Sequence, residues 1–370
     1  MKIYSSKFWA VLVLSLSFLS CSVLQPSKSN KSSVPVSAHV SDLMIIYHGG
    51  GHRPEWNPDQ IKHYVFREKE GNVEWLYDGF LFMEIRAEFN NKAYDFGVAK
   101  PSTLKPGKAE WQWLIDKTFA DVKKGPGAIE YLIDSLDKAG KPAPFKRKVV
   151  IGIPNPIEGT ENWGSVNGVE LDFTKNEDRI TAAKWYIDES LKAFNNRNYK
   201  HLELEGFYWI NEAIVRDFDV IKAVNEYVHS KNFTSSWIPY NYAPGADQWD
   251  EAGFDIAYQQ SNYFFLLDRP MSIMTRALNF ARDNGMAMEM EFDGKMHRPE
   301  YLPRFYDYIE MYGKYGVWES PSVAYYEGGG TWMNMANSSD PAVLKAFDDL
   351  ADIVVKRQNK LADSLRNSNK

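Results

Sequence analysis

Two kinds of segment alternate eight times between residues 42 and about 357. Short runs that are rich in apolar, β-branched and aromatic residues and bounded by Gly, Pro or Asn are typical of strands. They cover residues 42–48, 77–85, 146–154, 202–210, 233–241, 254–262, 285–293 and 316–326. Eight strands that alternate with helices predict a parallel sheet wrapped by helices, here a single-domain α/β (β/α)8 TIM barrel. An open doubly wound sheet is the alternative, but the sequence lacks its glycine-rich nucleotide turn.

Helical spacing separates the strand-like runs. Apolar residues recur every three or four positions over 180–194, 214–228, 302–312 and 343–354, as on the buried face of a helix. Thr174 and Glu177 have the spacing of a capping box before the first of these segments. Pro341 lies at a favourable first position of the last one. The connections after the first and fifth strands show weaker periodicity.

The N-terminus predicts a secreted, anchored protein. Residues 1–20 carry two lysines and an apolar run of about a dozen residues, which predicts a signal peptide. They resemble the bacterial lipoprotein type, which implies lipidation of Cys21; a catalytic or buried free thiol is the alternative. Residues 21–41 predict a flexible tether, and residues 359–370 a polar C-terminal tail. We expect the barrel, residues 42–358, to be anchored in the bacterial cell envelope, at the outer membrane, facing the periplasm or the exterior.

The composition excludes several classes of partner. The formal net charge is −6 and no long Lys/Arg stripe is present, so we expect no nucleic acid partner. Cys21 is the only cysteine, which excludes an intrachain disulfide and a cysteine metal site. Aromatic residues make up 15% of the chain, with 12 Trp and 21 Tyr; such a content suits a protein that stacks on ring-shaped ligands.

The run 285–293 separates into an apolar face and an acidic face, because successive side chains on a strand point to opposite sides. The acidic face carries Glu289, Glu291 and Asp293. Burying acids without partners costs several kcal/mol each. If this face points into the barrel, the acids need partners, water or a function. An edge strand with a solvated face is the alternative, which fits poorly with a closed barrel.

Asn211 and Glu212 follow the fourth strand-like run, where barrel enzymes place catalytic groups. A helix N-cap is the alternative interpretation of this pair. Together with an acid on the seventh strand, Glu212 supplies the two carboxyl groups that glycoside hydrolysis requires. One protonates the leaving oxygen, and the other attacks or activates water.

The chain resembles two groups of proteins at these residues. An Asn-Glu pair after strand four and a Glu near the end of strand seven form a pattern that resembles the catalytic pattern of clan A of the retaining (β/α)8 glycoside hydrolases. This resemblance implies Glu212 as acid/base, Asn211 as a contact of the sugar 2-hydroxyl and Glu291 as nucleophile. Glu289 and Asp293 stay open as partners of Glu212, and retention is favoured over inversion. The stretches "GFYWINEA", "WIPYNYAPGADQW", "FDIAYQQSNYFF" and "GMAMEMEFDG" resemble a bacterial family catalogued as domain of unknown function 4855, which implies the fold rather than a substrate.

Further residues are candidates for binding a sugar. Aromatic rings at a barrel rim can stack on sugar rings, with core packing as the alternative. The aromatic candidates are Trp163 in the long loop after the third strand, Trp209, Trp237, Tyr240, Tyr325 and Trp332. The polar candidates are Glu289, Asp293, Asn241, Gln260, Asn262 and His48, the last expected at the mouth of the barrel. An esterase oxyanion hole at "YHGGGH" is disfavoured because no Gly-x-Ser-x-Gly elbow is present.

The sequence therefore predicts a glycoside hydrolase that acts on an extracellular or periplasmic oligo- or polysaccharide. We expect no cofactor and no metal, and membrane contact only through the N-terminal lipid. The alternative is a non-catalytic, surface glycan-binding lipoprotein on the same scaffold. The identity of the sugar, its linkage and endo or exo action stay open at this stage.

Overall fold

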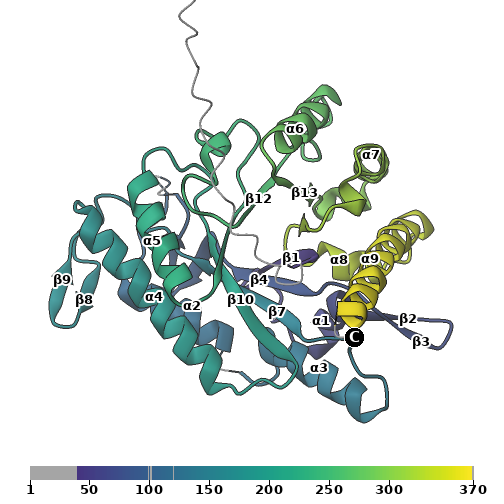
Figure 1. Cartoon of the computed structure of the whole chain (residues 1–370), viewed down its shortest axis with the longest axis horizontal. Helices are drawn as coiled ribbons and strands as arrows, with labels where there is room; N and C mark the ends of the chain where they lie inside the picture. The colour runs from purple at the N-terminus through teal and green to yellow at the C-terminus, as the bar shows by residue number, and fades with distance from the viewer. Residues whose placement is uncertain (1–39, 99, 101, 120, 369–370) are drawn as a thin grey trace, which may run out of the picture. The chain divides into compact units, whose positions relative to one another are not determined.

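The computed structural model describes residues 40–98, 100, 102–119 and 121–368. Eight parallel strands form a closed barrel in the order β1-β14-β13-β12-β11-β10-β7-β4 (Figure 1). The barrel strands are β1 (Asp42–Tyr47), β4 (Gly79–Met83), β7 (Arg147–Ile153), β10 (Leu202–Trp209), β11 (Thr234–Trp237), β12 (Ile256–Gln259), β13 (Ala287–Glu291) and β14 (Val323–Tyr326). Each lies within one of the eight predicted runs. The predicted TIM barrel is confirmed.

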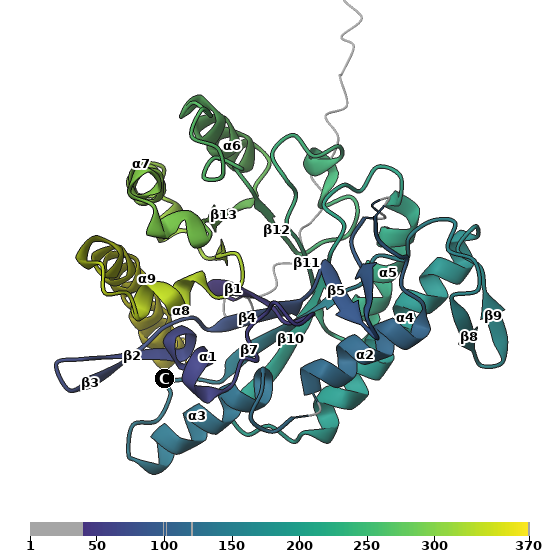
Figure 2. The ribbon, with the colours of Figure 1, turned by 180° about the vertical axis from the view of Figure 1, so that it is seen from behind.

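Helices surround the barrel in both views (Figures 1 and 2). They are α1 (Pro58–Val65), α2 (Lys108–Phe119), α3 (Pro126–Lys138), α4 (Asn176–Asn196), α5 (Phe218–Ser230), α6 (Ser272–Asp283), α7 (Leu302–Lys314), α8 (Thr331–Ala336) and α9 (Pro341–Ser368). The weakly periodic connection between β11 and β12 forms only a short 3₁₀ turn, η2 (Ala246–Gln248). Three antiparallel hairpins lie outside the barrel. They are β2 (Phe66–Lys69) with β3 (Asn72–Trp75), β5 (Arg86–Phe89) with β6 (Lys92–Asp95), and β8 (Gly164–Val166) with β9 (Val169–Leu171).

One helix prediction needs correction. The N-cap of α4 is Lys175, without a side-chain cap hydrogen bond, so the capping box expected from Thr174 and Glu177 does not form. Helix α9 starts at Pro341 as predicted and continues to Ser368. It therefore includes most of the residues from 359 on, among which Ala362 is buried.

Two apolar cores hold the barrel. An inner core fills its interior, and a larger outer core lies between strands and helices. On β13, Met288 and Met290 belong to the outer core, whereas Ala287 packs on the inner one. The carboxyl groups of Glu289 and Glu291 line a cavity inside the barrel mouth. The predicted separation of this strand into an outer apolar face and an inner acidic face is confirmed for these residues.

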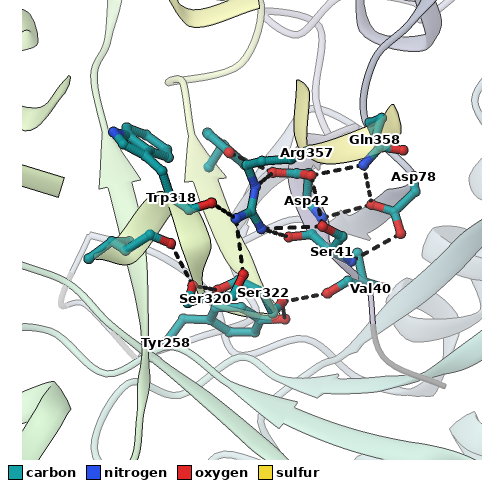
Figure 3. Close-up of polar contacts among 12 residues, drawn as sticks. Val40, Ser41, Asp42, Asp78, Tyr258, Trp318, Ser320, Ser322, Arg357 and Gln358 are labelled. Carbon is teal, nitrogen blue, oxygen red and sulfur yellow. Dashed lines mark hydrogen bonds and ion pairs between the residues drawn. The ribbon is translucent and has the colours of Figure 1, made fainter. Parts of the chain in front are cut away.

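A buried polar network closes the floor of the barrel, at the N-terminal ends of β1 and β4 (Figure 3). Asp42, the first residue of β1, accepts hydrogen bonds from Arg357 Nε at 2.7 Å, Tyr325 Oη at 2.7 Å and Gln358 Nε2 at 2.8 Å. Gln358 Nε2 also donates to Asp78 Oδ1 at 3.0 Å. Helix α9 is thereby tied to two strands, and the floor is filled by structural contacts.

The N-terminal predictions fall outside the described residues. The signal peptide, residues 1–20, Cys21 and most of the tether, residues 21–41, belong to this part. Within the part of the chain that the structure describes, no helix combines the length and the apolar character that crossing a membrane would require.

Candidate active site

A cavity of about 210 Å³ opens at the C-terminal mouth of the barrel. Its wall comes from β1, β4, β10, β13 and β14 and from the segments that follow β10, β11 and β12. The polar groups that line it are Glu212, Glu289, Glu291, Gln260, Tyr47, Tyr208 and Tyr326. Barrel enzymes hold their catalytic groups at this end, because the loops after the strands converge there.

Glu291, the last residue of β13, is held by hydrogen bonds on both carboxyl oxygens. Oε2 accepts from Asn262 N at 2.6 Å, Ser261 N at 3.0 Å, Tyr308 Oη at 3.0 Å and Ser261 Oγ at 3.2 Å. Oε1 accepts from Asn262 Nδ2 at 3.0 Å. Burial raises the pKa of Glu291 to about 7, while these donors act in the opposite direction by stabilising the carboxylate. The side chain is fixed in orientation and titrates near neutrality.

Glu212 reaches the same cavity from the segment after β10. Gln260 Nε2 donates to its Oε1 at 2.9 Å. Burial raises the pKa of Glu212, and the bond from Gln260 partly offsets that effect. Gln260 Oε1 in turn accepts from Asn262 Nδ2 at 2.7 Å, the amide that also contacts Glu291. Two side-chain amides therefore connect the two carboxyl groups across the mouth.

Glu289 is a third carboxyl group in the cavity, and only 2% of the residue is exposed. Its backbone carbonyl accepts from Tyr312 Oη at 2.6 Å, but no described residue donates a hydrogen bond to its carboxyl group. Burial, and then the charges of Glu291 and Glu212, raise the pKa of Glu289 well above its usual range. The protonated form of Glu289 is therefore favoured over the ionised one.

Asp293 and Asn211 lie outside the cavity lining. Asp293 caps the 3₁₀ helix η3 (Gly294–His297), where Oδ1 accepts from Lys295 N at 2.9 Å. Asn211 Nδ2 donates to Asp217 Oδ2 at 3.2 Å. The expected trio of acids on the seventh strand is thus corrected to the pair Glu289 and Glu291, because the chain turns at Asp293. The amide of Asn211 serves the start of α5 rather than the cavity wall.

Asn241, Gln260 and Asn262 were expected near the ends of the fifth and sixth strands as hydroxyl ligands. Gln260 lines the cavity, and Asn262 holds Glu291. Asn241 supports the turn between them: its N donates to Asn262 Oδ1 at 2.8 Å, and its Nδ2 donates to the Ser261 carbonyl at 3.0 Å. These three residues build one scaffold that positions the glutamates.

His48 does not reach the cavity, contrary to expectation. Its ring lies between the Met83 carbonyl, 3.1 Å from Nδ1, and Thr118 Oγ1, 2.6 Å from Nε2. It lines a separate cavity of about 200 Å³ that Thr118 on α2 also lines. Burial lowers the pKa of His48 to about 4. Among the described residues, no cluster of His, Cys, Asp or Glu is suited to hold a metal ion.

The aromatic candidates lie in the cores and not on the cavity wall. Trp163 is 2% exposed and stacks on Phe173, with ring centroids 5.4 Å apart. The outer core also contains Trp209, Trp237, Tyr325 and Trp332, all fully buried, with Tyr240 packed against it. These placements correct the prediction of rim platforms for Trp163, Trp209, Trp237, Tyr325 and Trp332, whereas Tyr240 is only partly buried. A large ring that faces the helices is covered by them and cannot stack on a ligand.

The structure reveals four aromatic residues that line the cavity and were not predicted: Tyr47, Tyr208, Phe265 and Tyr326. Two of them are direct neighbours of wrongly predicted residues. The register pairs Glu291 with Tyr326, so Tyr326 and not Tyr325 shares the inner face. The alternation of side chains along each strand was the signal that could have identified Tyr208 and Tyr326.

A family model described as "Domain of unknown function (DUF4855)" matches residues 42–352. No curated protein matches the chain.

Similar solved structures include a GH113 β-1,4-mannanase (10% identity, TM-score 0.41, covering 84% of this chain and 97% of that one). A putative α-L-fucosidase from Bacteroides thetaiotaomicron shows 12% identity and a TM-score of 0.43, covering 88% and 98%. A tryptophan synthase α-subunit from Pyrococcus furiosus shows 8% identity and a TM-score of 0.39, covering 84% of this chain and 96% of that one. At these values, no conclusion about chemistry follows from the likeness.

Proposed function

The chain belongs to the DUF4855 family, and we propose that its barrel is a glycoside hydrolase acting on an extracellular or periplasmic glycan. One observation carries this proposal. Glu212 and Glu291 come from different strands and share one cavity at the C-terminal mouth, where Gln260 and Asn262 connect them. Hydrolysis of a glycosidic bond needs two carboxyl groups on either side of that bond.

The two carboxyl groups suit different roles. Glu212 keeps a raised pKa through burial and accepts only one hydrogen bond from the described residues, so it serves as the general acid. Glu291 accepts five hydrogen bonds, which stabilise its ionised form and fix its orientation. These properties suit a nucleophile. Glu289 has no such donors among the described residues, and its surroundings raise its pKa, which makes it the poorer partner of Glu212.

The proposed mechanism is retaining and has two steps. Glu212 gives its proton to the glycosidic oxygen while a Glu291 oxygen attacks the anomeric carbon, so that the leaving group departs and a glycosyl ester forms. Glu212, now ionised, then takes a proton from water, and this water attacks the anomeric carbon and releases Glu291. The protein's own side chains balance every proton.

Replacing Glu212 and Glu291 singly by Gln tests the proposal. We expect E212Q to lower kcat/KM by about 10²–10⁴-fold, the usual contribution of a general acid, and E291Q to abolish turnover. Binding of the glycan should persist in both variants. Turnover is measured on a panel of aryl glycosides and polysaccharides, and NMR of the first product formed identifies its anomer.

Asp293→Asn is the matched control, because Asp293 closely follows the same strand but lies outside the cavity. It should keep wild-type turnover. A wild-type protein that binds glycans but hydrolyses none of the panel would instead support the glycan-binding alternative. A first product with inverted configuration at the anomeric carbon would still support a glycoside hydrolase, but it would rule out Glu291 as the nucleophile.

We also propose that Cys21 carries a lipid that anchors the protein at the outer membrane, facing the periplasm or the exterior. The signal-like residues 1–20 and the Ser-, Lys- and Pro-rich residues 21–41 support this proposal. Residue 41, where the predicted tether ends, directly precedes β1.

A further inference from the structure

The wall of the central cavity is acidic without any basic counterpart. It contains Glu212, Glu289 and Glu291, and none of the described residues that line it is Arg, Lys or His. The guanidinium of Arg53 lies nearby, 4.5 Å from the ring centroid of Tyr47. This cation is already engaged, because Nη2 and Nε donate to Glu84 at 2.9 and 3.0 Å.

An acidic substituent on the ligand would therefore meet the carboxylate of Glu291 and no cation among the residues that line the wall. Like charges held close together in a site with little water repel one another strongly. The glutamates already act on one another in this way, since Glu291 and Glu212 both raise the pKa of Glu289. A carboxylate or sulfate on the sugar would add to this repulsion without gaining an ion pair.

The carboxyl group of Glu289 is available to bind the ligand. It is 98% buried and lines the cavity, yet no described residue donates to its carboxyl group. Because this carboxyl group faces the cavity, it is open to a hydrogen-bond partner on a ligand. A sugar hydroxyl or a sugar ammonium group can satisfy it, whereas an acidic group cannot do so without further charge repulsion.

The size of the cavity limits the ligand to a short end of a chain. Its volume of about 210 Å³ is below the range of about 300–1,000 Å³ typical of drug-sized ligands. Its wall includes residues from strands on opposite sides of the barrel, β14 and β10 among them. Such a site accommodates one ring inserted end-on.

We propose that this cavity binds a single terminal sugar ring that carries no acidic group, and that Glu289 is the residue that binds a hydroxyl or amine of this ring. The inference rests on the proposed function and deepens it, because it adds the substrate class and exo action. Glu289 then contacts the substrate without taking part in bond cleavage.

The first test compares matched substrates of the wild-type protein. For each ring configuration, three 4-nitrophenyl glycosides share a leaving group and differ only in the sugar: a neutral hexoside, an unacetylated hexosaminide and a hexuronide. We expect turnover of a hexoside or hexosaminide, and a kcat/KM for the matching hexuronide that is about 10³-fold lower, the equivalent of one such charge pair. Oligosaccharides should release monosaccharides from one end.

The inference would be overturned if a hexuronide were the best substrate, or if chains were cleaved internally without release of monosaccharides. Either result would still support the proposed hydrolase function. Absence of turnover on every substrate would instead remove the proposed function itself. The two failures are therefore distinguishable.

The second test examines Glu289 directly with Glu289→Gln and Glu289→Ala. For a neutral ring, E289Q should stay within about threefold of wild type and E289A should lose about 10–100-fold, mainly through KM, as expected for one hydrogen bond of roughly 1–3 kcal/mol. For an amine-bearing ring, E289Q should lose as much as E289A, because the ion pair is lost. Both results support the inference. Loss of kcat in E289Q that added azide restores would make Glu289 the nucleophile and overturn it.

Discussion

Three residues of one type behave differently in this cavity because each has different neighbours. Glu291 accepts five hydrogen bonds, Glu212 accepts one from Gln260, and Glu289 accepts none from the described residues. All three are removed from water, which raises their pKa values. Only the donors decide which group is stabilised as a carboxylate. Neighbouring groups that separate the ionisation of like residues are a common way to assign acid and base.

The raised pKa of Glu291 predicts a pH-dependent stability. Its pKa is about 7 in the folded protein, against an ordinary value of 4.5. The stabilising contribution is fully present below pH 4.5, where the group is protonated in both states. It is lost as the pH rises through about 7, because only the unfolded chain ionises freely. Relative to Glu291→Gln, the wild type should lose on the order of 3 kcal/mol over this range.

Urea unfolding of both proteins at several pH values between 4 and 8 measures this effect. The difference between the two curves is the readout, since the substitution also changes the hydrogen bonds to Ser261 and Asn262 at every pH. Parallel curves for wild type and E291Q would show that Glu291 ionises normally in the folded protein.

At the scale of elements, the turn after β12 organises the site. Asn262 adopts a φ of 51°, a left-handed conformation that Asn tolerates better than most residues. This conformation accompanies a backbone N–H bond of 2.6 Å to Glu291, while the side chain reaches both Glu291 and Gln260. One short turn thus controls two carboxyl groups that are 79 positions apart in the sequence.

Helix α9 supplies the prediction at this scale. Arg357 donates to Asp42, which is fully buried at the start of β1 (Figure 3). Arg357→Met keeps the apolar stem but leaves the carboxylate of Asp42 without its cation. We expect a loss of about 3–5 kcal/mol in the free energy of unfolding, measured by urea denaturation.

Lys138→Ala is the control, because it removes an ion pair between exposed side chains, Lys138 and Asp134, within one helix. Its urea midpoint should match that of the wild type. If R357M also unfolds at the wild-type midpoint, hydrogen bonds alone hold α9 on the barrel floor.

At the scale of the whole molecule, the barrel separates stability from chemistry. The floor carries the network around Asp42, and the mouth carries the cavity with Glu212 and Glu291. Strand β1 runs from one to the other, with Asp42 at its start and Tyr47 on the cavity wall. The residue that follows the predicted tether, Asp42, therefore lies at the end opposite the candidate site.

This arrangement predicts that removing the anchor leaves the chemistry unchanged. Cys21 lies outside the described residues, and Cys21→Ser removes the sulfur that a lipid would modify. We expect the variant to appear in the soluble fraction of cells, with kcat/KM unchanged. Fractionation and kinetic assays measure the two effects. A variant that still sediments with membranes would reject the lipid on Cys21.

The sequence alone determined the fold and the meeting of two acids. Strand periodicity is local, so all eight barrel strands could be located from it, and the alternation in 285–293 correctly separated Met288 and Met290 from Glu289 and Glu291. Placing Glu212 at the same mouth followed from the rule that parallel strands end together.

Only the tertiary structure decided which other side chains surround these acids. Trp209 and Tyr325 look like ligand platforms by composition, but pairing between strands places their neighbours Tyr208 and Tyr326 on the cavity wall. The sequence likewise does not reveal that no described residue donates a hydrogen bond to the carboxyl group of Glu289. Contacts of this kind depend on register and packing between segments far apart in the chain, and no local pattern records them.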